Sequence, residues 1–282
     1  MSIQLEKTLA QFHKVAEWKA VTVDDLVWDY AVGGAGSDWL FVIHGGGGDA
    51  ESMFPYFTAL APHFKLIAPS IPSTLDNMLA ITDGLRVIFE REGISRAHIF
   101  GPSLGGMIAQ VFAAHHPELT GKCILSHTTL PTPELGARMR KARLPLKLMP
   151  LGLFRWQTLR SLRNNLKNEI PDITIDESAF WLARFQNAFG NKLGKADILA
   201  SVDLQVDFYE QTDLTNSFLR SDPERVMVIF HENDPEFGAD AAATIQEFYG
   251  NAQCHGLPTY GHLGAMIRTD EIIKLIKLHL TE

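Results

Sequence analysis

The fold is decided by the stretch Ala97-His98-Ile99-Phe100-Gly101-Pro102-Ser103-Leu104-Gly105-Gly106. It begins as a short apolar segment, passes through Gly-x-Ser-x-Gly, and continues into residues 107–114, which favour a helix. A strand, a sharp turn and a helix in this order are the context of a nucleophile elbow, which exposes a serine at the tip of the turn. Glycine is expected on both sides because a Cβ there would collide with the neighbouring strand or helix. The stretch therefore predicts that Ser103 is a nucleophile rather than a merely strained turn residue.

Alternating strand and helix patterns flank this elbow. Residues 39–43 and 65–69 are continuous apolar runs, which are typical of strands covered on both faces of a parallel sheet. Further strands are expected at 19–23, 26–32, 121–127, 224–230 and 252–255, and helices within 1–19 and at 77–92, 238–249 and 270–280. This order predicts an α/β fold with a mostly parallel, doubly wound sheet.

The alternation stops between residues 131 and 211, where four helical stretches are expected, at 135–144, 153–165, 176–189 and 195–209. Pro145, Pro150 and Pro171 are expected to mark the joints between them. We interpret 131–211 as a helical cap inserted into a core made of 1–130 and 212–282. The first two helices are basic and apolar together, so a membrane-surface helix and a plain solvated face remain alternatives.

Composition bounds the partners and the compartment. The net charge is −8 and no basic stripe runs along the chain, which argues against nucleic acid as a partner. The two cysteines, Cys123 and Cys254, are expected to be free thiols in a reducing compartment. The first residues lack the pattern of a secretory signal, and no apolar run reaches the ~18 residues that span a bilayer. We expect a cytoplasmic protein without a transmembrane segment; a homodimer remains open.

The run His44-Gly45-Gly46-Gly47-Gly48 follows the apolar strand at 39–43. A phosphate-binding loop would need a different glycine spacing or a lysine, and neither is present. The alternative is an oxyanion hole, which takes one backbone N–H from such a loop and one from the residue after the nucleophile. We therefore expect the N–H groups of Gly46 (or Gly45) and Leu104 to face a developing oxyanion, and His44 to hold the loop by hydrogen bonding.

A serine nucleophile needs a base, and the base needs an orienting acid. His262 and Asp234 are the candidates because Ser103, Asp234 and His262 each follow a strand, at the edge where open α/β sheets bind ligands. The rivals are His255 for the base and Glu232, Glu236, Asp203 and Asp207 for the acid. Neither a His-Glu-x-x-His motif nor a paired Cys/His spacing occurs, so no metal is expected.

With these motifs the sequence resembles the α/β-hydrolase fold superfamily over essentially the whole chain. The resemblance rests on His44–Gly47, Phe100–Gly106, Asn233–Pro235 and Gly261–His262. It implies an eight-stranded sheet, a cap after the sixth strand and no cofactor. A narrower resemblance, to the maspardin branch, rests on residues 23–25 before a Trp-bearing strand and on residues 98–110. Maspardin itself is regarded as a binding protein with an incomplete triad. Epoxide hydrolases and dehalogenases of this fold carry Asp where Ser103 stands, which argues against both activities.

The sequence thus predicts a serine hydrolase that cleaves a carboxylic ester, lactone or related acyl bond through an acyl-enzyme on Ser103. The apolar cap suggests a small apolar or aromatic acyl substrate, while its basic residues leave a carboxylate-bearing one open. Two alternatives remain. One is a non-catalytic binding or scaffold protein that kept the fold. The other is a C–C bond hydrolase that acts on a diketone-type substrate.

Overall fold

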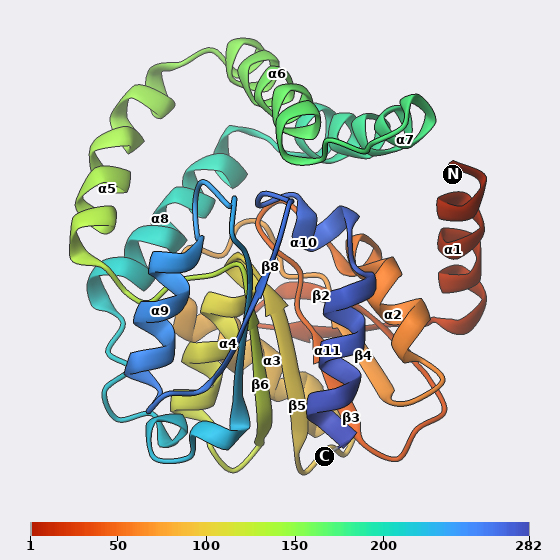
Figure 1. Cartoon of the computed structure of the whole chain (residues 1–282). Helices are drawn as coiled ribbons and strands as arrows, with labels where there is room; N and C mark the ends of the chain where they lie inside the picture. The colour runs from red at the N-terminus through yellow and green to blue at the C-terminus, as the bar shows by residue number, and fades with distance from the viewer. Residues whose placement is uncertain (1, 282) are drawn as a thin grey trace.

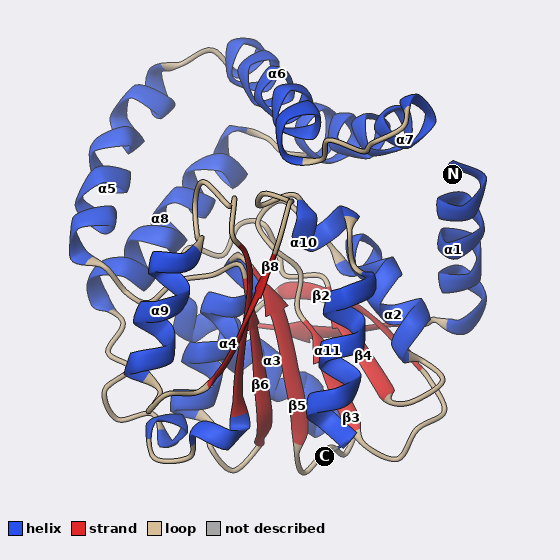
Figure 2. Cartoon of the chain, viewed as in Figure 1, coloured by secondary structure: helices blue, strands red, loops and turns tan. Residues whose placement is uncertain are grey.

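An eight-stranded sheet forms the centre of the computed structural model, which describes residues 2–281 (Figures 1 and 2). The strands are β1 (Glu17–Val23), β2 (Leu26–Gly33), β3 (Trp39–Val42), β4 (Lys65–Pro69), β5 (Ala97–Pro102), β6 (Thr120–Ser126), β7 (Val226–His231) and β8 (Gln253–Leu257). Their order across the sheet is β1-β2-β4-β3-β5-β6-β7-β8. The pairs β1–β2 and β2–β4 are antiparallel, and the other neighbours are parallel. The predicted eight-stranded, mostly parallel α/β sheet is confirmed.

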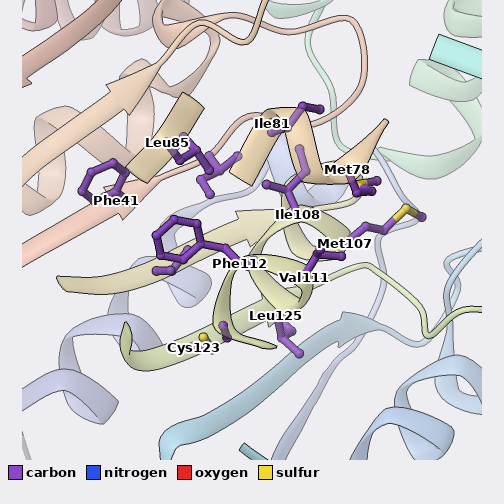
Figure 3. Packing of buried hydrophobic residues seen from close by; sticks show 14 of the residues in the cluster. Phe41, Met78, Ile81, Leu85, Met107, Ile108, Val111, Phe112, Cys123 and Leu125 are labelled. Atoms are coloured by element: carbon purple, nitrogen blue, oxygen red, sulfur yellow. The ribbon is translucent and has the colours of Figure 1, made fainter. Parts of the chain in front are cut away.

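Helices cover both faces of the sheet, because each central strand is apolar on both sides. In β3 and the residue after it, Phe41 and Ile43 face one buried cluster while Leu40 and Val42 face the other, as the two-residue repeat of a strand requires. The first cluster packs under α3 (Met78–Arg91), α4 (Leu104–His115) and α9 (Ala239–Phe248), and Figure 3 shows part of it. The second packs under α1 (Ser2–Val15), α2 (Phe54–Leu60) and α11 (Asp270–Thr281).

The segment between β6 and β7 is helical, as predicted. It contains α5 (Pro133–Leu148), α6 (Leu151–Glu169), α7 (Ile175–Phe185), a π-helical stretch (Gln186–Lys192) and α8 (Lys195–Gln211). Helices α6 and α7 lie beyond the end of the sheet at which β5 and β6 terminate (Figure 1). None of the helices in residues 2–281 is long and apolar enough to cross a membrane.

Two local expectations were wrong, and one helix was not predicted. Pro145 is not a joint, because α5 continues through it and breaks only before Pro150. Pro145 and Lys141, whose carbonyl loses its helical N–H partner to the proline ring, are both exposed, so water can bond to that carbonyl. The helix expected at 176–189 changes to π-helical geometry at Gln186. A short helix, α10 (Gly264–Ile267), was not expected at all.

The first prediction concerns the core. Phe41 is 1% exposed and stacks on Phe89 with 4.2 Å between ring centroids. Phe41→Ala should lower the free energy of unfolding by about 3–5 kcal/mol, because it removes buried apolar surface and leaves a cavity. Leu79→Ala is the control: Leu79 is 51% exposed on α3 and should cost at most about 0.5 kcal/mol. Urea denaturation measures both, and equal losses would contradict this account of the core.

Candidate active site

Ser103 lies at the turn between β5 and α4 in a strained backbone conformation, with φ +54° and ψ −123°. Such a conformation costs of order 1–3 kcal/mol and persists only where its surroundings enforce it. Two of the enforcing features are visible. The Ser103 N–H donates to the Ser126 carbonyl of β6 at 2.9 Å. A Cβ on Gly101 would lie 2.2 Å from the carbonyl group of Gly105, so strand and helix approach closely only because glycine is present.

The model brings Ser103, His262 and Asp234 together at the carboxyl edge of the sheet. His262 Nε2 lies 3.1 Å from Ser103 Oγ, and His262 Nδ1 lies 2.8 Å from Asp234 Oδ2. Asp234 follows β7, and His262 lies in the loop between β8 and α10. A hydroxyl, an imidazole and a carboxylate in this line are able to move a proton from Ser103 to His262 while Asp234 holds the ring.

Asp234 is held as a buried carboxylate. Its Oδ1 accepts hydrogen bonds from the N–H groups of Glu236 at 2.8 Å and Phe237 at 3.0 Å. Burial alone would raise the pKa of the carboxyl, but the hydrogen bond and charge of His262 and these two N–H donors keep that pKa below its ordinary value. Asp234 is therefore ionised at neutral pH and stabilises a charged imidazole beside it.

None of the rival residues takes the place of Asp234 or His262 in this hydrogen-bonded line. Glu236 is exposed, with its carboxylate 4.0 Å from His262 Nε2, on the side of the ring away from Asp234. Asp203 pairs with Arg143, and Asp207 accepts a hydrogen bond from the Met78 N–H at 2.8 Å. The two remaining rivals are the exposed Glu232, which follows β7, and His255, which lies within β8.

Glu169, at the end of α6, is a site residue that the sequence reasoning missed. Its Oε2 accepts a hydrogen bond from the Leu263 N–H at 2.8 Å, and its main-chain carbonyl accepts one from the Gly261 N–H at 3.3 Å. One bond is made by the residue before His262 and the other by the residue after it. A single residue of the inserted segment therefore holds the loop that carries His262. No local pattern announces this role, because Glu169 and His262 are distant in sequence and only the fold joins them.

Three carboxylates act on His262. Burial alone would lower its pKa, but the hydrogen bond and charge of Asp234, together with the charges of Glu236 and Glu169, raise that pKa above the ordinary 6.5. At pH values well above this pKa the ring is neutral, so Nε2 is able to accept a proton from Ser103.

A pair of histidines lies close to His262, and the sequence reasoning missed it as well. His127 and His231 are buried and joined by a hydrogen bond of 2.7 Å, and Ser126 Oγ bonds His127 at 2.7 Å. Burial lowers the pKa of His231 to about 4 and that of His127 well below its ordinary value. Both rings are therefore neutral at neutral pH, so neither adds a positive charge beside His262. His231 also bonds the main chain of Gly261, next to His262.

The glycine loop after β3 lies against the elbow. A Cβ built on Gly45 would be 3.3 Å from the Pro102 carbonyl, whereas one on Gly46 would meet no atom within 4 Å. Gly46 thus faces open space, and its N–H donates to no main-chain carbonyl of the described chain. The Leu104 N–H, in the first turn of α4, has no partner within the helix. Both N–H groups are available to an oxyanion.

His44 anchors this loop. Its Nε2 accepts a hydrogen bond from the Ile71 N–H at 3.1 Å, so the ring proton is on Nδ1, which donates to the Gly45 carbonyl at 2.8 Å. Burial lowers the pKa of His44, which keeps the ring neutral. Within the described chain no group of three or more His, Cys, Asp and Glu residues could hold a metal ion.

Comparisons with known proteins agree with this fold. A family model described as "Alpha/beta hydrolase family" matches residues 40–275. A Pseudomonas putida protein named 2-hydroxy-6-oxononadienedioate/2-hydroxy-6-oxononatrienedioate hydrolase 1 is 22% identical over 303 residues, which cover 100% of both chains. Human maspardin is 22% identical over 83% of this chain and 72% of maspardin. The crystal structure of a hydrolase from Pseudomonas aeruginosa matches with a TM-score of 0.74 and 16% identity, over 94% of this chain and 99% of that chain.

The second prediction follows from the pKa of His262. The rate at which a fluorophosphonate labels Ser103 should rise with pH through an inflection above 6.5, because only neutral His262 removes the serine proton. Glu169→Gln should move that inflection to lower pH, since it removes a negative charge that stabilises the imidazolium while an oxygen remains to accept from Leu263.

The measurement is the labelling rate constant between pH 5 and 9, in wild type and variant. Glu210→Gln is a matched control. Glu210 lies on α8, pairs with Arg140 of α5 and makes no contact with His262. An inflection that shifts equally in both variants, or in neither, would refute the electrostatic role of Glu169.

Proposed function

The chain belongs to the alpha/beta hydrolase family, and on that premise we propose that it is a serine hydrolase that cleaves a carboxylic ester, lactone or related acyl bond. One observation carries the proposal: the line from Ser103 Oγ through His262 to Asp234, with distances of 3.1 and 2.8 Å. In this proposal residues 131–211 form a cap over a core made of 1–130 and 212–282.

The reaction has two halves. Ser103 Oγ attacks the carbonyl carbon while His262 Nε2 takes its proton, and Asp234 stabilises the imidazolium that forms. The same proton then passes to the leaving oxygen, which departs and leaves an acyl group on Ser103. Water attacks this acyl-enzyme with His262 again as base, and Ser103 is restored.

The N–H groups of Gly46 and Leu104 receive the negative charge that develops on the carbonyl oxygen. Gly45, which lies against Ser103, is the alternative donor in the same loop. Donors of this kind are fixed before the reaction starts, and losing one typically raises the barrier by about 2.7–4 kcal/mol. In this proposal His44 supports the loop and carries no proton in the reaction.

A second candidate is hydrolysis of a C–C bond next to a ketone. The observation in its favour is the Pseudomonas putida relative, whose name describes a hydrolase of an oxo-dioate and which aligns with the whole of this chain. The same serine, histidine and oxyanion donors are able to act on a ketone carbonyl. A non-catalytic binding protein is the third reading; it gives no reason for a buried carboxylate aligned with His262 and Ser103.

The third prediction tests the triad. Ser103→Ala should abolish turnover of a short p-nitrophenyl ester, and Asp234→Asn should lower kcat roughly 10³–10⁴-fold because the imidazolium loses its partner. The control is Glu232→Gln, an exposed residue two positions before Asp234, which should leave kcat within about twofold.

Steady-state kinetics on esters, lactones and a vinylogous 1,5-diketone separate the candidates. Turnover of the diketone alone would favour C–C hydrolysis over the ester proposal. A folded wild type that turns over none of these substrates and takes up no fluorophosphonate would refute catalysis altogether.

A further inference from the structure

A cavity of about 250 Å³ lies between the glycine loop and the inserted helical segment. Gly46 and Leu104, the two proposed oxyanion donors, belong to its wall. Leu104 directly follows Ser103, so a carbonyl group held by these N–H groups has this cavity beside it. At roughly 30 Å³ per water-sized group, the cavity holds a moiety of roughly eight heavy atoms.

The cavity is mostly apolar. Phe154 from α6, Phe189 from the π-helical stretch and Leu193, Ile198 and Val202 from the chain around α8 form much of the wall that the inserted segment contributes. Ile71 and Leu75 line it from the loop after β4. Contact with an apolar chain removes this surface from water, which favours binding of such a chain.

Asp197 is the one acidic residue in the described wall, and it is ionised. Its carboxylate accepts hydrogen bonds from Ser73 Oγ at 2.6 Å and from the Gly194 N–H at 2.7 Å. These hydrogen bonds, with that of Ser73 foremost, lower the pKa of Asp197. The wall therefore carries a negative charge.

The Lys and Arg side chains near the cavity bond to groups of the protein itself. None of the described wall residues is Lys or Arg. Lys192 pairs with Asp49 at 3.0 Å, and Lys195 donates to the carbonyls of Leu146 and Met149. Arg155 Nη2 donates to the Leu193 carbonyl at 2.8 Å, while its buried Nε has no hydrogen-bond partner among the described residues. The two lysines are thus paired within the protein, and Arg155, whose Nε lacks a partner, does not belong to the cavity wall.

From this wall we infer that the cavity takes a neutral, apolar acyl chain of up to about eight heavy atoms and rejects an acyl chain that ends in a carboxylate. The inference rests on the proposed function, because it assigns the substrate class of the same site. A carboxylate there loses water, meets no Lys or Arg side chain in the wall and shares the cavity with the negative charge of Asp197, so its burial is unfavourable. The dioate substrate type of the second candidate function is disfavoured for the same reason.

The test uses two esters of equal shape. The acyl chains of p-nitrophenyl 6-methylheptanoate and p-nitrophenyl hydrogen adipate have the same number of heavy atoms, and only the second ends in a carboxylate. After subtraction of the uncatalysed rate, kcat/KM should be at least about 100-fold higher for the neutral ester.

Two substitutions sharpen the comparison. Gln205→Arg places a cation at a half-buried position of the wall and should narrow the preference at least about tenfold, while Asp197→Asn removes the negative charge and should narrow it several-fold. Gln157→Arg is the matched control: it adds the same charge to an exposed position of α6 outside the wall, and the preference should stay unchanged.

A preference below tenfold, or an equal response to Gln205→Arg and Gln157→Arg, overturns the inference and leaves the proposed function standing, because at least one ester is then a substrate. The absence of turnover with either ester, together with the absence of fluorophosphonate labelling, overturns the proposed function itself and the inference with it.

Discussion

The site depends on one close contact, that of α4 with the ends of β3 and β5. A Cβ on Gly105 would lie 2.3 Å from the Ile43 carbonyl, so the first turn of α4 rests directly on the main chain that leaves β3. The helix therefore begins immediately after Ser103, whose backbone is held at positive φ. The same contact brings the glycine loop beside the elbow, since that loop starts one residue after Ile43. Ser103 and the loop of the proposed oxyanion donors are thus brought together by packing of main chain on main chain.

How far the sequence predicts this arrangement depends on the range of each interaction. The elbow, β3 and β4 are marked by local patterns, and their bounds agree with the structure to within two residues. The roles of Glu169, His127 and His231 have no local signal, because their partners come from other elements. Pro145 shows the opposite failure: its local signal for a helix break is strong, but an exposed helix tolerates the lost hydrogen bond.

The electrostatics explain why one histidine among several near the site is suited to act as a base. His44, His127 and His231 are buried without a carboxylate close enough to offset desolvation, and burial lowers the pKa of each. His262 is half-buried, but Asp234 bonds it and two further carboxylates lie near, which raises its pKa. The neutral rings are then free to serve as fixed hydrogen-bonding groups that hold main chain in place. Burial alone does not distinguish these residues, but the carboxylate partner does.

The inserted segment touches both halves of the site, so substrate recognition and chemistry are physically linked. Glu169 bonds the loop that carries His262, and the ring of Phe189 packs against Gly47, close enough to leave no room for a side chain there. Phe189 also lines the cavity. A shift of this segment that moves Glu169 or Phe189 therefore acts on the loop that carries His262 or on the glycine loop. In the proposed mechanism the turns after the sheet strands supply the nucleophile and the acid, and the helices between β6 and β7 then contact both the cavity and the loops that hold the reacting groups.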